Sequence, residues 1–278
     1  MRNESNSAAI AFWAVLALPA TVLGGCLPWV GAETGARGSI GTVSHGLLLE
    51  PERLPREGEG YVFYKQTSRR WGIPELISLV RRTAERVGER HSGSRLILGD
   101  LSARRGGFVG GHRSHRSGRD VDIGFFTTDT AGTGGSYAPL VEFDRFGVGV
   151  RRGEPLRFDD ARNWAVVEAL LTDPEADVQW IFVSRGLKAR LMSWALGRDR
   201  DPRIVERAAS VLHQPSDSAP HDDHFHVRIY CPTPGPGTCR DLGPVWPWVA
   251  KRREQRLAGE TRWDPEDLVR MGLEGIGG

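Results

Sequence analysis

Three of the eight histidines in this chain fall within six residues, in the stretch PHDDHFHVRIYC from Pro220 to Cys231. An earlier stretch, GGHRSHRSGRDVDIGF from Gly110 to Phe125, holds two more histidines followed by two aspartates. Zinc hydrolases bind their metal through three protein groups, such as histidine nitrogens and carboxylate oxygens, and leave a fourth position for water. These residue types therefore predict a hydrolytic zinc site to which both stretches contribute.

Each stretch ends in a pattern that predicts a strand. Polar and apolar residues alternate at the end of the later stretch, which places His224 and His226 on the same face. Two imidazoles are too few for the predicted site. The end of the earlier stretch alternates in the same way and brings Asp122 onto its polar face, shortly after His115. The earlier stretch therefore supplies the remaining metal ligands.

The elements that position these residues are predicted from the spacing of apolar side chains. Helices are expected over residues 73–89, 158–171 and 186–195, and strands over residues 95–99, 119–125, 178–183 and 224–230. This order of elements favours an α+β fold with a small, mostly antiparallel sheet, flanking helices and the zinc site on the sheet face. The tail from Asp241 onward is predicted to be a surface helix or an extension.

The first residues predict export. One arginine precedes a mostly apolar run from Ala8 to Leu23, which is shorter than the about 20 apolar residues of a membrane-spanning helix. We therefore expect residues 1–25 to be a signal peptide. The sequence LGGC at residues 23–26 also looks like a bacterial lipobox, in which Cys26 would carry a lipid anchor. Secretion without an anchor is the alternative.

Charge and cysteine content narrow the partners. The 37 basic residues are almost balanced by 35 acidic ones, and the balance holds along the whole chain. No phosphate-binding face and no nucleic-acid partner are therefore predicted. Cys231 and Cys239 flank the turn PTPGPGT, and in an oxidising compartment this arrangement predicts a disulfide.

The stretches SHRSGRDVDI and PHDDHFHVRIYC together resemble the penicillin-insensitive murein endopeptidases, within the superfamily of lysostaphin-type peptidases, D-Ala-D-Ala carboxypeptidases and hedgehog domains. The likeness extends from about Ser39 to Cys231 and so covers most of the exported chain. It implies a zinc peptidase domain over residues 26–242 and a C-terminal extension over residues 243–278. The positions that match the zinc ligands of the family are His115, Asp122 and His226, and those that match its other site histidines are His112, His221 and His224.

Roles follow from the chemistry of amide hydrolysis. An imidazole near the metal can accept a proton from water and return it to the leaving nitrogen, because its pKa of about 6.5 leaves both forms accessible. No glutamate lies near the later stretch, so His224 is the first choice for this catalytic role and His221 the second. Asp120 either orients a ligand imidazole or is a solvated acid at a strand end. His112 is either a further metal ligand or a substrate contact.

The function implied by the resemblance is that of a zinc metallo-endopeptidase that hydrolyses D-alanyl to meso-diaminopimelate cross-links in peptidoglycan. A D,D-carboxypeptidase or dipeptidase acting on uncross-linked stems, and a noncatalytic zinc-containing module that binds the cell wall, are the alternatives. The implied location is the periplasm or cell envelope, as an outer-membrane lipoprotein if Cys26 is lipidated.

Three features leave details of the substrate open. The segment HQPSDSAP at residues 213–220 is longer and more polar than the approach to the final strand in the family, so the preferred stem peptide is not predicted. Residues 136–155 contain no histidine that could support a second metal. Three arginines near the site are interpreted as solvated or structural rather than as substrate clamps, although a carboxylate-rich peptide would suit any of them: Arg116, Arg119 and Arg228. The oligomeric state is not predicted.

Overall fold

The computed structural model describes residues 38–132, 134–135, 140–198, 200–233 and 237–260. The predicted signal peptide, Cys26 and the last residues of the extension lie outside these ranges. None of the helices in the described part of the chain is long and apolar enough to cross a membrane.

The main sheet has seven strands in the order β14-β13-β15-β8-β7-β5-β4. Their bounds are β4 Glu57–Gly58, β5 Tyr61–Phe63, β7 Leu96–Leu98, β8 Asp120–Gly124, β13 Val178–Phe182, β14 Leu212–His213 and β15 His224–Ile229. Neighbouring strands are antiparallel except for the pairs β13/β14 and β5/β7, which are parallel. The predicted mixture of helices with a mostly antiparallel sheet is confirmed, but this sheet is larger than the small one expected.

Shorter strands surround the main sheet. Two antiparallel pairs are formed by β1 (Gly38–Gly41) with β2 (Gly46–Leu49), and by β3 (Glu52–Arg53) with β6 (Trp71–Gly72). A separate antiparallel sheet has the order β10-β9-β12-β11, with β9 Thr127–Thr128, β10 Gly134–Gly135, β11 Val148–Arg151 and β12 Glu154–Phe158. The apolar run LLLE at residues 47–50 predicts a short strand among loops, and β2 confirms it. The other short strands were not predicted, because most lie among glycines and turn-forming residues.

Five helices are found in the described residues: α1 Pro74–Arg90, α2 Asp160–Leu171, α3 Arg185–Leu196, α4 Pro202–Val211 and α5 Pro247–Glu260. The first three match the predicted helices closely. Helix α2 begins at Asp160, two residues after the start of its predicted range, because the Asp159 carboxylate caps it by accepting a hydrogen bond from the backbone N–H of Arg162. Helix α4 was missed, although Asp201 caps it and apolar residues at helical spacing are buried along it.

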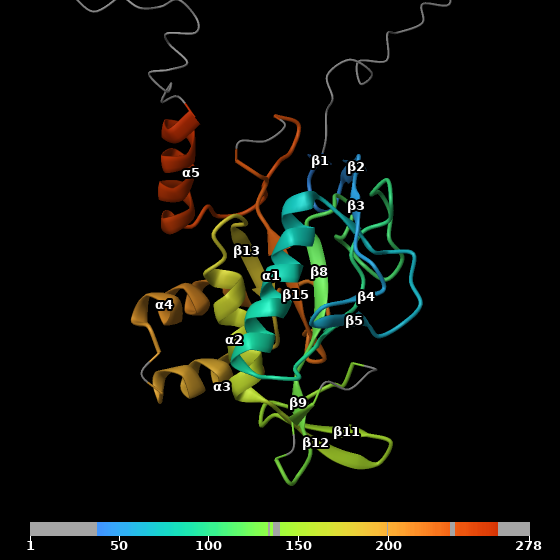
Figure 1. Ribbon diagram of the computed structural model, residues 1–278, viewed down its shortest axis with the longest axis vertical. Helices are drawn as coiled ribbons and strands as arrows, with labels where there is room; N and C mark the ends of the chain where they lie inside the picture. Colours follow the sequence, from blue (N-terminus) through green and yellow to red (C-terminus); the bar gives the residue numbers. More distant parts are fainter. Residues whose placement is uncertain (1–37, 133, 136–139, 199, 234–236, 261–278) are drawn as a thin grey trace, which may run out of the picture. The chain divides into compact units, whose positions relative to one another are not determined.

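The packing of β8 and β15 decides where the site lies. Their register places His226 opposite Asp122 and Arg228 opposite Asp120. The alternate residues of both strands, such as Val121 and Val227, are fully buried in the core. Helices α1 and α2 lie in front of β8, β13 and β15 in Figure 1, and α2 packs against β13. The polar faces of the two strands are thereby left for the site.

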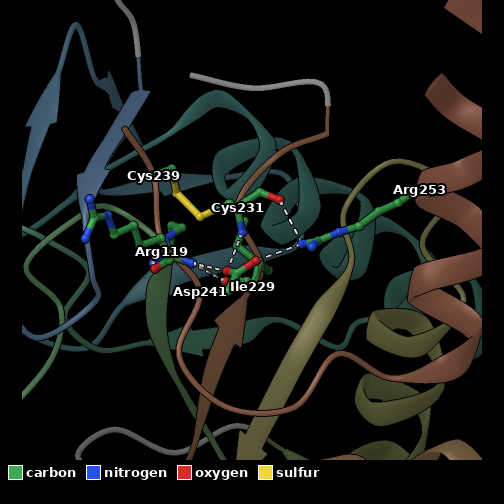
Figure 2. Close-up of a disulfide and its surroundings, with 7 residues drawn as sticks. Arg119, Ile229, Cys231, Cys239, Asp241 and Arg253 are labelled. Atoms are coloured by element: carbon green, nitrogen blue, oxygen red, sulfur yellow. Dashed lines mark hydrogen bonds and ion pairs between the residues drawn. A yellow bond between two sulfur atoms is a disulfide. The ribbon is translucent and has the colours of Figure 1, made fainter. Parts of the chain in front are cut away.

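The predicted disulfide is confirmed, with Cys231 and Cys239 joined and their Cα atoms 5.9 Å apart. Figure 2 shows it beside Asp241, whose carboxylate accepts hydrogen bonds from the Cys231 N–H (2.8 Å), Arg119 Nη1 (2.8 Å) and Arg253 Nη2 (2.9 Å). Arg119 belongs to the chain just before β8, and Arg253 belongs to α5. This carboxylate therefore links the extension to the start of the strand that carries Asp122.

Replacing Asp173 with asparagine should lower the free energy of unfolding by about 2 kcal/mol at neutral pH, because a buried charged partner of a cation is lost. The Asp173 carboxylate, 1% exposed, accepts hydrogen bonds from Arg82 of α1 (2.7 and 2.9 Å) and from the Ala176 N–H (2.7 Å). Burial acts to raise the pKa of Asp173, but the hydrogen bonds from Arg82 and the backbone outweigh it and lower this pKa below 3.8.

A carboxylate with a lowered folded-state pKa stabilises the fold above its ordinary pKa, and this contribution is lost as pH falls through the folded-state value. Denaturant titrations should therefore show the Asp173→Asn difference at pH 7 and a shrinking difference below about pH 4. Asp201→Asn is the control, because asparagine caps α4 as well as aspartate does. An undiminished difference in acid would contradict the charge-based explanation.

Candidate metal centre

Asp122 lies at the middle of the candidate site. It sits on β8 with its side chain almost fully buried, and its backbone is fixed by hydrogen bonds to Gly99 (2.8 Å) and Asp100 (3.1 Å) beyond the end of β7. A Cβ atom at Gly99 would lie 2.8 Å from the Cβ of Asp122. Glycine is therefore required at position 99, because a side chain there would prevent the backbone at Gly99 from lying this close to Asp122.

Four imidazoles each direct one ring nitrogen toward the Asp122 carboxylate. The nitrogens closest to Oδ1 are Nε2 of His115 (3.2 Å), Nε2 of His224 (3.5 Å) and Nδ1 of His226 (3.9 Å), and Nδ1 of His112 lies 3.9 Å from Oδ2. The earlier and later stretches of the sequence therefore meet around one carboxylate, as predicted. His221 lies beside them, with its ring centroid 5.3 Å from that of His224 and 5.4 Å from that of His226.

The opposite nitrogen of each of these four rings lies beside an oxygen. The pairs are His112 Nε2 with Asp100 Oδ2 (3.2 Å), His115 Nδ1 with the Leu101 carbonyl (3.1 Å), His224 Nδ1 with Asp223 Oδ1 (2.5 Å) and His226 Nε2 with Asp120 Oδ1 (2.8 Å). Such outer hydrogen bonds fix the tautomer and orientation of metal-binding histidines. Asp120 accordingly orients an imidazole, which was one of its two predicted roles.

Two residues of this outer set were not predicted from the sequence. Asp100 lies two residues after the end of β7 and also accepts hydrogen bonds from Lys65 Nζ (3.1 Å) and Arg69 Nη1 (3.1 Å), so it ties His112 to the chain between β5 and β6. Asp223 precedes His224 in the sequence. The signal for Asp100 was a carboxylate at the end of a predicted strand, and the signal for Asp223 was its position next to a site histidine.

Two site histidines have unusual backbone conformations. His115 has φ of 63° and His221 has φ of 54°, in the left-handed region that non-glycine residues rarely adopt. Such conformations cost of order 1–3 kcal/mol and persist where the surrounding structure enforces them. These backbone conformations therefore lower the stability of the fold, and in return they set the direction in which the two imidazoles point.

Neighbouring charges shift the pKa values of Asp122 and of the histidines around it. Burial opposes ionisation of Asp122, but His115 and His224 hold the pKa of its carboxyl well below the usual range. Burial likewise acts to lower the pKa of His224, whereas the carboxylates of Asp122 and Asp223 raise it to about 10.

The pKa values of His221 and His226 shift in the opposite direction. Burial, together with the nearby charge of His224, lowers the pKa of His221 to about 4. Burial and the charge of His115 lower the pKa of His226 to about 3. Near neutral pH both rings are therefore neutral, which is the form in which imidazole binds a metal.

A metal ion fits this group of residues. The candidate ligand atoms of His112, His115 and Asp122 all lie within 4.8 Å of one another. His115 Nε2 and Asp122 Oδ1 are buried, and among the described residues neither has a partner with hydrogen-bond geometry. Buried polar atoms without partners are rare in folded proteins, and a cation between imidazoles and a carboxylate would satisfy both. His226, the remaining predicted ligand, presents Nδ1 to the same carboxylate.

The group lies at the wall of a cleft of about 810 Å³. His112, His221, His224 and His226 line it, together with Phe182 and Arg228. Arg113 Nη1 and Asp217 Oδ2 form an ion pair (2.7 Å) that joins the loop of the earlier stretch to the segment 213–220, on the margin of the cleft. The candidate metal centre is thus accessible to a large substrate.

Comparison with known proteins gives one consistent result. The family described as penicillin-insensitive murein endopeptidase matches residues 39–247. A protein of that name from Haemophilus influenzae is 30% identical over 224 residues, which cover 77% of this chain and 70% of the relative. One from Escherichia coli O139:H28 is 31% identical over 232 residues, which cover 82% of this chain and 79% of the relative.

Proposed function

Because the chain belongs to the penicillin-insensitive murein endopeptidase family, we propose that it is a zinc-dependent endopeptidase that hydrolyses D-alanyl to meso-diaminopimelate cross-links in peptidoglycan. The observation that carries the proposal is the set of imidazoles around Asp122, each held by an outer oxygen, on the wall of an open cleft. In this assignment His115, Asp122 and His226 hold the zinc ion. His112 is either a further ligand or a substrate contact.

Zinc, when bound, supplies a Lewis acid that polarises the amide carbonyl and lowers the pKa of water to about 7. The remaining chemistry belongs to side chains. His224 is placed to take a proton from the attacking water and to return it to the leaving nitrogen, with Asp223 fixing its ring through Nδ1. His221, a neutral imidazole on the same wall, is the second candidate for this role.

The cleft favours an endopeptidase over the two alternatives. A cleft of about 810 Å³ is larger than a terminal dipeptide requires, whereas a cross-link has peptide on both sides of the bond to be cut. A noncatalytic zinc module would need no imidazole beyond its ligands, but His221 and His224 both line this cleft. The proposed location is the periplasm or cell envelope, where the substrate lies. A lipid anchor at Cys26 stays a prediction.

The protein beginning after residue 25 should convert defined cross-linked muropeptide dimers into monomers, as followed by mass spectrometry. A chelator should stop the reaction, and added zinc should restore it. An uncross-linked pentapeptide stem is the control substrate and should stay intact. Release of D-alanine from the stem alone would favour a carboxypeptidase, and no reaction at all with one metal bound per chain would favour a binding module.

A further inference from the structure

Arg228 occupies a position that the proposed mechanism does not use. It lies on β15 two residues after His226, so both side chains project from the same face of the strand. Its side chain is 15% exposed and lines the cleft that contains the candidate metal centre. A guanidinium is therefore held on the cleft wall, two residues along the strand from the proposed zinc ligand His226.

The guanidinium is fixed on one side only. Its Nε donates to Asp120 Oδ1 at 2.8 Å, and its central carbon lies 5.1 Å from the ring centroid of Phe182. Among the described residues, neither Nη1 nor Nη2 of Arg228 has a hydrogen-bond partner. These two nitrogens form a pair of donors whose spacing matches the two oxygens of a carboxylate.

Two other arginines near the site, Arg119 and Arg113, are arranged differently. Arg119 is fully buried, and its terminal nitrogens donate to Asp241 and to the carbonyls of Ile229 and Arg240. Arg113 is exposed on the margin of the cleft and is paired with Asp217. The interpretation of Arg119 as structural therefore agrees with its contacts. Arg228 combines a fixed orientation with unpaired donors, which a purely structural arginine does not need.

The proposed substrate carries a carboxylate where such donors could reach it. In a D-alanyl to meso-diaminopimelate cross-link, the carbon that bears the scissile nitrogen also bears a free carboxylate. Arg228 follows His226 on the same face of the strand and lines the cleft in which a bond held at the metal would lie, so its long side chain can reach a carboxylate next to that bond.

We propose that Arg228 binds the carboxylate next to the scissile nitrogen and so makes the enzyme selective for cross-links in which that group is free. This inference rests on the proposed endopeptidase function and adds a specificity determinant to it. The assignment explains why Asp120 contacts Arg228 through Nε alone. That contact orients the guanidinium and leaves Nη1 and Nη2 available to the substrate.

Two synthetic cross-linked dimers test the proposal, one with the free carboxylate and one with a carboxamide at that position. Wild-type protein should prefer the carboxylate in kcat/KM by about 10- to 100-fold, the range expected for hydrogen bonds to a charged group. In Arg228→Gln the preference should fall to within about threefold, because both the charge and the planar fork are lost. Arg228→Lys should keep only part of the preference, because it retains the charge without the fork. Arg113→Gln, which removes another arginine of the same cleft, should keep the preference.

Metal content is measured for each variant, because Asp120 contacts both Arg228 and His226. Equal losses on the two dimers in both Arg228 variants would overturn the proposal and assign Arg228 to support of Asp120 alone. A wild-type protein that cleaves both dimers equally would also overturn it, and would leave the endopeptidase function intact. Failure of wild-type protein to cleave either dimer would reject the proposed function, and this inference with it.

Discussion

Asp122→Asn protein should bind no zinc under conditions in which wild-type protein binds one equivalent, and its cleavage of cross-linked dimers should fall by about 10³-fold or more. The carboxylate is the centre toward which four imidazoles point, and burial prevents water from replacing it. Loss of metal removes Lewis-acid stabilisation worth several kcal/mol in the transition state, which corresponds to at least three orders of magnitude in rate.

The substitution keeps the size of the side chain and changes its charge. Zinc content is measured by mass spectrometry under native conditions, and circular dichroism verifies that the protein has folded. Asp217→Asn is the matched control, because Asp217 also lines the cleft, and within the described ranges its carboxylate pairs with Arg113 alone, at the margin. It should keep both metal and turnover. Full zinc binding by Asp122→Asn would show that the metal is held elsewhere in the chain.

The strand face on which the candidate residues lie could be predicted, because strand periodicity is a local property. The alternation HFHVRI places His224, His226 and Arg228 on one face whatever the strand pairs with, and the structure has this strand as His224–Ile229. Asp122 was predicted in the same way from the alternation around it. The helix Pro74–Arg90 was likewise predictable, because its apolar residues recur at helical spacing.

Pairing and register could not be predicted, because they depend on contacts between distant segments. The register that sets His226 opposite Asp122 joins residues 104 positions apart in the sequence. Asp100 reaches His112 only because β7 lies next to β8, so its part in the site depends on the sheet order. The orientation of Arg228 depends on Asp120 and Phe182, which come from two other strands. A single sequence contains no record of these approaches.

His224→Ala protein should keep its zinc and lose about 10²- to 10⁴-fold in kcat, the range expected when a proton-transfer group is removed. In the proposed assignment this imidazole is not among the zinc ligands. Its Nδ1 is held by Asp223, and its Nε2 points into the group around Asp122. The side chain can therefore be removed without taking away a proposed ligand, and the turnover of cross-linked dimers is compared with the bound zinc in the same sample.

His221→Ala and His45→Ala separate a proton-transfer role from general damage to the cleft. His221 lies beside His224, with a pKa lowered to about 4 by burial and the charge of His224, so its removal should cost less than that of His224. His45 lines the same cleft outside the group of imidazoles around Asp122, and its removal should leave kcat unchanged. Loss of zinc together with activity in His224→Ala would make His224 a ligand, and a larger loss in His221→Ala would exchange the two roles.

The pH dependence gives an independent test of the same assignment. In the protein without metal, the pKa of His224 is raised to about 10 by Asp122 and Asp223 against the effect of burial, so the ring is protonated at pH 7. A divalent cation beside Asp122 competes with that proton and favours the neutral ring. Zinc binding at pH 7 should therefore release a proton from wild-type protein that His224→Ala does not release, as measured by calorimetry in buffers of different ionisation enthalpy. Equal proton release by both proteins would mean that metal binding does not change the protonation of His224, which would contradict this account of its charge.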